Sequence, residues 1–363
     1  MTKREEEILN IIQKNPFISQ EELAYILGIS RAGVASHIHN LLNKGYIIGK
    51  GYVLSDRQFV SVIGGVNIDI MGISNNPVVL DNSNPGKIAH TLGGAGWNIA
   101  LTLAKLNVGN HFITVYGDDI HGKNFLDVSK KNEINTQCCE LIPKENTSTY
   151  TYIVDSNGDR VVGVDDMEIY DRITPEFIEK YLTKINNSQI CVFDTNIPEK
   201  TIQFLYDKVK VPLIVKTVSQ NKNMRLLKGI ENIDFLITTS REIFQILEPL
   251  KKKFTKVDQA VNYLYECGVK NILLFTVQDG LYFKSKTESF TIQNKFKIKN
   301  ATGANACLTG ALIWGLKNHL PLKTSLKYAY AAAINSAESE EVINPNLSAH
   351  YLGDIYTTIF GES

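Results

Sequence analysis

The sequence lacks the features of a secreted or membrane protein. Its five cysteines, Cys138, Cys139, Cys191, Cys267 and Cys307, are odd in number and show no C-x-x-C spacing. A disulfide framework and a zinc site are therefore not expected, and we assign no metal-binding residue. No apolar run reaches the roughly 18 residues that a transmembrane helix needs. We expect a cytoplasmic protein with reduced thiols and no membrane partner.

An excess of charge of either sign is also missing. The 363 residues include 38 Lys and Arg against 38 Asp and Glu. This balance excludes a global electrostatic attraction to nucleic acid or to a membrane surface, so any DNA binding must be local. The length predicts more than one domain, and we place a boundary between 1–57 and 58–363.

Two common nucleotide-binding motifs are missing too. No G-x-x-x-x-G-K-[ST] stretch occurs, which excludes an ordinary P-loop. The glycine-rich stretch at 93–98, GGAGWN, does not have the G-x-G-x-x-G spacing of a dinucleotide fingerprint. A nucleotide site in this chain must therefore be built in another way.

The first 57 residues predict three short helices and a hairpin. Apolar residues at helical spacing mark a helix that ends at Asn15-Pro16. Ser19 and Glu22 form a predicted capping box that begins a second helix, which stops at Gly28. Ser30 is the predicted N-cap of a third helix over 31–43, and 46–54 has the pattern of a small hairpin.

This pattern resembles the winged helix-turn-helix of bacterial regulators. In such a module the third helix enters the major groove of DNA. Affinity from phosphate contacts rises with their number, so we expect a dimer with two copies to bind DNA more tightly than a monomer. The alternative is a helical domain used only for packing or dimerisation. The residues expected to face DNA are Ser30, Arg31, Ser36, His37, His39 and Asn40.

From residue 58 onward the chain alternates predicted strands and helices. A buried strand at 59–65 ends in glycines, and Asn67 and Asp69 follow with both side chains on one face. The later rhythm predicts a doubly wound, mainly parallel α/β sheet. Two excursions with turn residues, 71–92 and 147–167, together predict a small β lid. The later segments are strands at 189–193, 213–218, 235–238 and 271–275, and helices at 198–208, 241–247 and 256–267.

The stretch at 300–310, NATGANACLTG, predicts a turn that leads into a buried helix. The N-terminus of such a helix carries unpaired backbone N–H groups and the positive end of the dipole, which suit a phosphate or a developing oxyanion. Phosphoryl transfer would call for a carboxylate beside this turn. The sequence offers Ala306 instead.

Two of these stretches resemble the signatures of the ribokinase/PfkB carbohydrate kinases. The stretch 93–98 resembles the first signature, and 301–306 stands where the second, T-T-G-A-G-D, belongs. The resemblance implies a ribokinase-like fold, ATP and Mg²⁺ as cosubstrates, and a homodimer. Further stretches are similar to the pseudouridine kinase branch, which often carries an N-terminal winged helix: 67–70, 83–86, 117–119, 148–150, 165–167, 218–222 and 344–348.

On the sugar side the resemblance implies that Asp69 accepts hydrogen bonds from ribose hydroxyls. A carboxylate that accepts two hydroxyls discriminates sugars well, because the loss of either partner leaves a buried charge underpaired. The alternative is that Asn67 and Asp69 only cap a strand-to-loop turn. The residues implied for the sugar pocket and the base end of the ligand are Asn67, Asp69, Gly93, Gly94, Asn98, Ser148 and Asp166.

On the transfer and nucleotide side the sequence departs from the family pattern. The family's catalytic aspartate is replaced by Ala306, which cannot accept a proton. The T-x-G-x-x-G pattern is one residue short at 276–280, and the N-x-x-E pattern at 239–242 keeps only its glutamate. The implied anion hole is Thr302, Gly303, Ala304 and Asn305, and the implied nucleotide-binding residues are Lys222, Glu242, Thr276 and Gly280.

These departures favour a degenerate kinase that binds a pentose or pseudouridine-like ligand and couples its binding to DNA. The alternative is an active ATP-dependent pseudouridine or sugar kinase with another base, such as Asp279 or a water molecule. Loss of a general base costs about 10²–10⁴-fold, while positioning supplies much of the acceleration, so slow turnover is compatible with Ala306. Asn305 is expected to keep the turn by adopting a left-handed backbone, at more cost than glycine.

Overall fold

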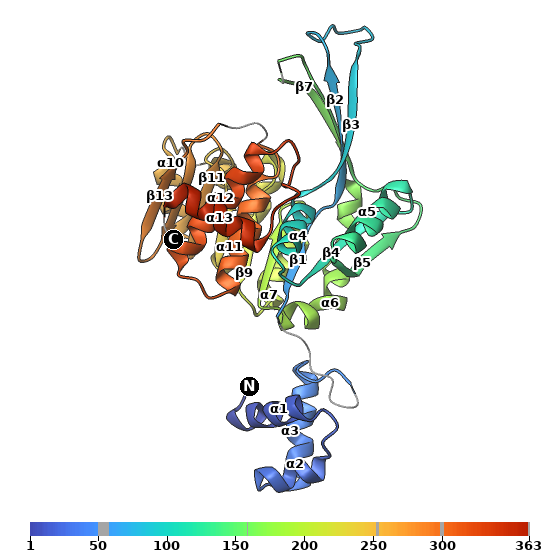
Figure 1. Cartoon of the computed structure of the whole chain (residues 1–363), viewed down its shortest axis with the longest axis vertical. Helices are drawn as coiled ribbons and strands as arrows, with labels where there is room; N and C mark the ends of the chain where they lie inside the picture. The colour runs from blue at the N-terminus through green and yellow to red at the C-terminus, as the bar shows by residue number, and fades with distance from the viewer. Residues whose placement is uncertain (50–57, 158, 252–253, 298–300, 362–363) are drawn as a thin grey trace.

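The computed structural model describes residues 1–49, 58–157, 159–251, 254–297 and 301–361. A helical module at the N-terminus and a narrow β sheet lie at opposite ends of the long axis, with an α/β body between them (Figure 1). The body supplies most of the buried apolar residues, in one cluster on each face of its sheet.

The N-terminal module contains the predicted helices α1 (Lys3–Lys14), α2 (Gln20–Leu27) and α3 (Arg31–Asn43). The capping box of Ser19 and Glu22 is confirmed, and Gly28 ends α2 with a left-handed backbone at φ +63°. Side chains that include Ile8, Leu23 and Val34 form a separate small core. The predicted hairpin at 46–54 lies largely outside the described residues.

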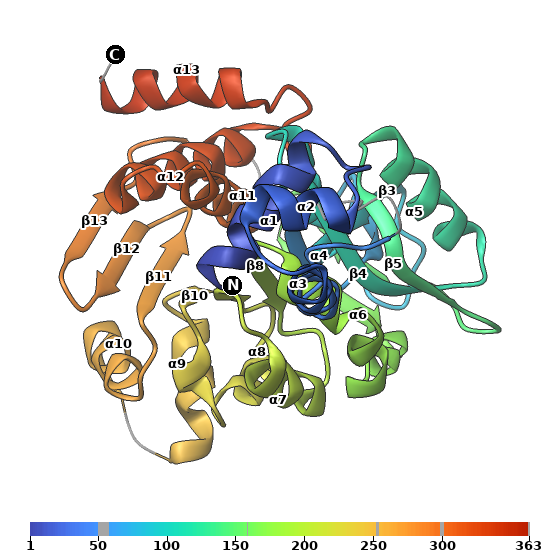
Figure 2. The ribbon, with the colours of Figure 1, turned by 90° about the horizontal axis from the view of Figure 1, so that it is seen from below.

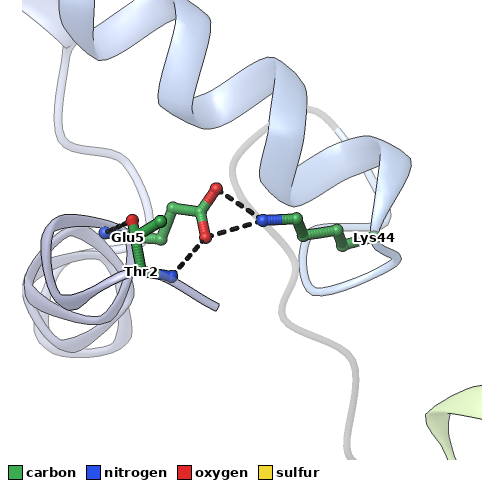
Figure 3. Close-up of polar contacts among 3 residues, drawn as sticks. All are labelled: Thr2, Glu5 and Lys44. Carbon is green, nitrogen blue, oxygen red and sulfur yellow. Dashed lines mark hydrogen bonds and ion pairs between the residues drawn. The ribbon is translucent and has the colours of Figure 1, made fainter.

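A buried carboxylate ties the two ends of this module together (Figure 3). The Glu5 side chain is 1% exposed, and both of its oxygens lie 2.8 Å from Nζ of Lys44, just after α3. The Thr2 backbone N–H donates to the same carboxylate at 2.7 Å. The hydrogen bonds from Lys44 and Thr2 hold the pKa of Glu5 below its ordinary value.

The body is built on a nine-stranded sheet in the order β13-β12-β11-β10-β9-β8-β1-β4-β5. Every neighbouring pair is parallel except β11 with β12 and β12 with β13. The predicted doubly wound, mainly parallel sheet is therefore confirmed. Its strands are β1 (Val60–Ile63), β4 (Asn110–Gly117), β5 (Asn135–Ile142), β8 (Ile190–Asp194), β9 (Leu213–Lys216), β10 (Phe235–Thr238), β11 (Asn271–Thr276), β12 (Gly280–Ser285) and β13 (Ser289–Gln293).

Helices cover both faces of this sheet, as Figure 2 shows for α12 on one side and α9 on the other. Residues of α4 (Ala95–Lys105), α5 (Ile120–Lys131), α11 (Ala304–Lys317), α12 (Leu322–Glu338) and α13 (Ala349–Phe360) pack into one apolar cluster. The opposite cluster includes residues of α6 (Pro175–Asn187), α7 (Glu199–Lys208), α9 (Glu242–Leu247) and α10 (Val257–Glu266). Shorter helical segments are α8 (Gln220–Asn223), Glu168–Arg172, Met224–Leu226, Ile230–Asn232 and Glu248–Leu250.

The predicted lid is a four-stranded sheet that projects from the body (Figure 1). Its order is β3-β2-β6-β7, with β2 antiparallel to β3, parallel to β6, and β6 antiparallel to β7. The strands are β2 (Asn67–Ser74), β3 (Gly86–Gly93), β6 (Thr149–Val154) and β7 (Arg160–Asp166). Because β2 begins at Asn67, the side chains of Asn67 and Asp69 belong to the base of the lid and not to a loop.

Candidate functional site

The buried Asp194 carboxylate, at the end of β8, joins two glycine turns. Its Oδ2 accepts hydrogen bonds from the backbone N–H groups of Gly65 at 3.0 Å and Gly96 at 2.8 Å. Burial raises the pKa of Asp194, and the backbone donors oppose this shift. A side chain at Gly64 would meet Asp194 at 2.3 Å, so the glycine permits this close approach. The ends of β1 and β8 and the start of α4 are thereby fixed to one another.

A cavity of about 430 Å³, here called the lid cavity, lies where the base of the lid meets the starts of α4 and α11. Its lining includes the predicted residues Asn67, Asp69, Gly94 and Asn98. Gly93 is not part of the lining, but a Cβ there would lie 2.2 Å from Asp69 Oδ2, so this glycine makes room for the carboxylate.

Asp69 is the half-buried carboxylate of the lid cavity. Its Oδ1 accepts a hydrogen bond of 2.6 Å from Nδ2 of Asn67. Burial raises the pKa of Asp69 to about 6, against the opposing effects of the Asn67 bond and the Arg160 charge. The ionised carboxylate is therefore poorly solvated, which makes it a strong acceptor for ligand hydroxyls.

The start of α11 forms another wall of the lid cavity, through Thr302, Gly303, Asn305 and Ala306. Gly303 has φ +82°, and a Cβ on it would lie 2.2 Å from the Val342 carbonyl oxygen. Cys307 N–H bonds the Gly303 carbonyl at 2.9 Å, so the N–H groups of 304–306 have no acceptor within the helix. Ala304 is fully buried and does not line the cavity.

The backbone of Asn305 differs from the conformation expected from the sequence. It lies inside α11 and is absent from the residues with positive φ among those that the structure describes, so its expected left-handed backbone is wrong. The left-handed residue of the turn is Gly303. Asn305 Oδ1 is buried without a hydrogen-bond partner in the described part of the chain, and Asn305 lines both this cavity and the larger one described below.

Ala306 brings a methyl group to the lid cavity, where it is 5% exposed. The carboxylates that line this cavity are Asp69 and Asp165, among the described residues. Asp279, named as a possible substitute base, lines only the larger cavity and a smaller pocket. Among the described residues, Asp69 and Asp165 are therefore the carboxylates that share the lid cavity with the Ala306 methyl group.

Three predicted site residues, Ser148, Asp166 and Lys222, do not lie where the sequence analysis placed them. Ser148 is buried and donates from Oγ to the Asp166 carbonyl at 3.0 Å, and neither residue lines the lid cavity or the larger cavity described below. The neighbouring Asp165 lines the lid cavity instead. Lys222, expected on the nucleotide side, also lies in the lid cavity, where Nζ donates to Asn196 Oδ1 at 2.9 Å. Burial lowers the pKa of Lys222.

A larger cavity of about 830 Å³, here called the strand-end cavity, lies at the loops that follow β9, β10 and β11. Glu242 and Thr276 line it, and Glu242 Oε2 accepts a hydrogen bond of 2.6 Å from Thr217 Oγ1. Thr276 Oγ1 bonds Asp279 Oδ2 at 2.8 Å, which closes the short turn. Gly280 does not line the cavity but begins β12 at φ +95°.

Two cationic residues of the site were not singled out from the sequence. Arg160, at the start of β7, lines both cavities. It donates to Tyr150 Oη at 2.8 Å and lies 4.9 Å from the Tyr152 ring centre. Lys216, at the end of β9, lines the lid cavity and is 6% exposed. Lys216 could have been predicted as a site residue, because it is a lysine at the end of an otherwise apolar strand.

The residues predicted to face DNA lie on α3 or cap it. Ser30 Oγ accepts the Gly33 N–H at 3.1 Å and so caps α3. Arg31 lies 3.3 Å from the exposed Glu21 carboxylate, and His39 Nε2 lies 3.0 Å from Asn43 Nδ2. Ser30, Arg31, Ser36, His39 and Asn40 are exposed and His37 is half-buried.

Among the described residues, no group of three or more His, Cys, Asp or Glu side chains is placed to hold a metal ion, and no helix has the length and hydropathy to cross a membrane.

Comparisons with known proteins agree with this arrangement. A model of the pfkB family of carbohydrate kinases matches residues 57–349, and a winged helix-turn-helix DNA-binding model matches residues 1–48. An uncharacterized sugar kinase of Escherichia coli (strain K12), YeiI, is 29% identical over 352 residues, which cover 96% of this chain and 97% of that protein. The pseudouridine kinase of the same strain is 27% identical over 298 residues, which cover 81% of this chain and 95% of that protein.

A solved structure has the same fold. The ribokinase of Arabidopsis thaliana, complexed with ribose and ATP, superimposes with a TM-score of 0.72 at 21% identity and covers 82% of this chain and 98% of its own. The pfkB family model spans the lid, the body as far as the start of α13, and all residues that line the two cavities. The chain belongs to the pfkB family of carbohydrate kinases.

Proposed function

We propose that this protein binds a pentose or a pseudouridine-like nucleoside in the lid cavity, transfers phosphate slowly or not at all, and couples ligand binding to DNA binding. One observation carries this proposal. The lid cavity combines Asn67 and Asp69 with the start of α11, yet its wall carries the Ala306 methyl group where the family's pattern has a carboxylate.

The sugar side has the chemistry that a polyol needs. Asp69 accepts from Asn67 through Oδ1, and Asn98 adds an amide to the same lining. A carboxylate and two amides offer both acceptors and donors to neighbouring hydroxyls. Loss of one ligand hydroxyl would leave a polar group unpaired in a half-buried site, which is the basis of selectivity. The names of the relatives, a sugar kinase and a pseudouridine kinase, support this ligand class.

The transfer side keeps the groups that position a phosphate. The start of α11 lines the lid cavity through Asn305 and Ala306, and its first N–H groups have no acceptor within the helix. Arg160 lines both cavities. These groups stabilise charge but cannot remove a proton from an attacking hydroxyl. Phosphoryl transfer depends largely on positioning and charge, so we expect the missing base to slow the reaction strongly.

The strand-end cavity fits a nucleotide with its metal ion. Its volume of about 830 Å³ adjoins the lid cavity through shared residues such as Asn305 and Arg160. Mg²⁺ that enters with ATP takes ligands from the phosphates and needs only one or two carboxylates from the protein. Glu242 and Asp279 line the cavity and would supply them. When bound, MgATP would provide the phosphoryl group and neutralise part of its charge.

DNA binding is proposed for the exposed face of α3 in a homodimer. Two copies would double the phosphate contacts of a module with few basic side chains. The contact between module and body includes a hydrogen bond of 3.2 Å from Asn187 Nδ2, at the end of α6, to the Gly45 carbonyl after α3. Ligand binding that shifts the body would reach DNA through this contact. We also infer a cytoplasmic location, consistent with five unpaired cysteines.

Steady-state kinetics with ATP, Mg²⁺ and pseudouridine or ribose test the proposal. We expect turnover far below the roughly 1–100 s⁻¹ of ordinary kinases. We also expect a rise in melting temperature with ligand in the absence of ATP, because a ligand that binds only the native state stabilises it. Turnover in the ordinary range would contradict the degenerate kinase, and no shift with any pentose or nucleoside would contradict the ligand.

An active kinase with another base is the second candidate. The adjacent cavities and the uncapped start of α11 favour it, because both substrates could still be brought together. A water molecule would then have to accept the proton, since Asp279 lies on the nucleotide side. A rate that rises with pH without a plateau near neutrality, as expected for hydroxide or water, would distinguish this candidate.

A further inference from the structure

Lys216 is a buried cation in the wall of the lid cavity. Its ammonium donates a hydrogen bond to the Thr217 carbonyl. No carboxylate forms an ion pair with it among the described residues. A buried charge without an opposite charge is unfavourable. An anion in the cavity would relieve this cost.

The start of α11 offers a second feature that favours an anion. No side chain caps this helix in the described part of the chain, so its first N–H groups have no acceptor within the helix, and its positive dipole end lies beside the cavity that Asn305 and Ala306 line. Gly303, which allows the turn, and Lys216 line the same cavity. A buried ammonium and an open helix N-terminus therefore meet at one space.

The charges that line the lid cavity favour an anionic ligand. The lining carries three basic side chains, Arg160, Lys216 and Lys222, against two carboxylates, Asp69 and Asp165. The carboxylates of Asp194 and Asp165 raise the pKa of Lys222 against the larger effect of burial, whereas no carboxylate among the described residues forms an ion pair with Lys216. An aspartate at position 306 would place a third carboxylate beside the helix end and repel a phosphate dianion. Its replacement by alanine removes that repulsion.

We propose that the lid cavity binds the phosphorylated form of its ligand, a pentose phosphate or a nucleoside 5′-monophosphate, more tightly than the unphosphorylated form. The phosphate lies at the start of α11 against Lys216, and the ligand hydroxyls bond Asp69. The protein then senses the product of a sugar or nucleoside kinase reaction rather than its substrate. This inference rests on the proposed function, because it takes sugar binding in the lid cavity as given.

Calorimetric titration of the full chain without ATP and Mg²⁺ tests the preference. The probes are ribose, ribose 5-phosphate, pseudouridine, pseudouridine 5′-phosphate and inorganic phosphate, at constant ionic strength. We expect each phosphorylated probe to bind about tenfold or more tightly than its parent, which corresponds to about 1.4 kcal/mol. Equal or tighter binding of the parents overturns this inference and leaves the proposed function intact. Binding by none of the sugars overturns both.

The variant Lys216→Met tests the origin of the preference. We expect it to weaken binding of the phosphorylated probes about tenfold more than binding of their parents. The control Lys131→Met, on the exposed surface of α5, should change the affinity for neither class of probe. Without ligand, Lys216→Met should melt no lower than the natural protein, because it removes an uncompensated buried charge. A lower melting temperature together with equal loss of both ligand classes would show a structural lysine and overturn the inference.

The variant Ala306→Asp provides a second test that does not touch Lys216. The added carboxylate at the helix end should weaken binding of the phosphorylated probes more than binding of their parents. The matched change Ala306→Asn adds similar volume without charge and should weaken phosphate binding less. An unchanged preference in Ala306→Asp would overturn a phosphate position at the start of α11.

Discussion

Asn67 donates a hydrogen bond to Asp69 at the base of the lid, with Nδ2 and Oδ1 2.6 Å apart. The amide holds one carboxylate oxygen toward a cavity that also contains the start of α11. A sugar bound to Asp69 would thus lie in the same space as the anion-binding end of that helix.

Ligand binding should weaken in acid. Burial raises the pKa of Asp69 to about 6, and hydroxyl donors bind the ionised carboxylate better than the protonated one. We expect affinity for pseudouridine or ribose to fall as the pH drops through about 6, measured by calorimetric titration. Asp69→Asn should bind weakly and lose this pH dependence. An unchanged affinity between pH 7 and pH 5 would contradict a role for Asp69.

In the ligand-free protein Asp69 should have the opposite effect: its contribution to the free energy of unfolding should rise as the pH falls. Its folded-state pKa lies above the ordinary value, so between about pH 6 and pH 4 the folded state binds a proton that the unfolded state does not. This carboxyl therefore favours the folded protein more as the pH falls through that range. The difference in unfolding free energy between the natural protein and Asp69→Asn, measured across the range, isolates the effect from other groups.

Restoring the missing carboxylate should raise the rate of phosphoryl transfer. Ala306→Asp places a proton acceptor at the start of α11, and general-base catalysis contributes about 10²–10⁴-fold. We expect any residual turnover with ATP, Mg²⁺ and pseudouridine to rise within that range. Ala306→Asn is the control and should not show the rise. If Ala306→Asp is as slow as the natural protein, the defect includes the strand-end cavity.

Gly303 should tolerate no side chain. Its backbone is left-handed, and a Cβ would lie 2.2 Å from the Val342 carbonyl oxygen. We expect Gly303→Ala to lower the unfolding free energy by about 1–3 kcal/mol, measured by denaturant titration. Gly353→Ala is the matched control in α13, where nothing lies within 4 Å of the added methyl group. That change should be neutral or slightly stabilising, and a similar loss in both variants would contradict the argument.

Loss of the Lys44 ammonium should destabilise the N-terminal module. Lys44→Met would leave the buried Glu5 carboxylate without its cation, at a cost of about 1–3 kcal/mol. Both tryptophans, Trp97 and Trp314, lie in the body, so their fluorescence would not report this change. Hydrogen exchange of α1 and α3 in the full chain would.

The pH dependence of the same ion pair has a defined sign. The folded-state pKa of Glu5 is lowered, so its stabilising contribution is present above the ordinary glutamate pKa of about 4.3 and is lost as the pH falls through the folded-state value. In the double variant with Glu5→Gln and Lys44→Met, the opening free energy obtained after correction for the intrinsic pH dependence of amide exchange should be lower and should no longer change across this pH range. Exchange in Lys44→Met that equals the natural rate would refute the pairing.

The coupling between ligand and DNA should depend on Asn187. Its side chain reaches the Gly45 carbonyl of the module, away from both cavities and from α3's exposed face. We expect Asn187→Ala to bind ligand and DNA separately with near-natural affinity, while ligand changes DNA affinity less. Gel-shift titrations with and without ligand measure this difference, and calorimetry with and without DNA should give the same factor because linkage is reciprocal. If ligand changes the DNA affinity of Asn187→Ala as much as that of the natural protein, the coupling does not pass through this hydrogen bond.

Local chemistry made much of the fold predictable. The capping box of Ser19 and Glu22 and the C-terminal Gly28 define α2 from neighbours in sequence, and the structure confirms each. The apolar strands from 189 to 275 were also found, because parallel strands covered on both faces are nearly continuous apolar runs. The turn before α11 was predicted from the stretch that contains Gly303. Asn305, which was also expected to have a left-handed backbone, is helical.

Contacts between distant segments were beyond such patterns. Arg160 reaches both cavities only because β7 pairs with β6 in the lid. Glu5 and Lys44 are separated by two helices, and nothing in their local sequence marks them as a pair. Asp165 rather than Asp166 lines the lid cavity. Which of two neighbouring residues faces the cavity depends on the register of the strand, because a shift of one residue moves every side chain to the other face of the sheet.

The two backbone bonds from the glycine turns to Asp194 divide the ligand site into a fixed part and an adaptable part. The turn after β1 and the start of α4 cannot shift independently, since both donate to one carboxylate. No described residue of the lid strands donates to Asp194, so substitution of the cavity residues Tyr150, Tyr152 and Asp165 leaves the bonds of the glycine turns in place. New ligand preferences can therefore evolve by substitution in the lid while the floor of the cavity stays intact.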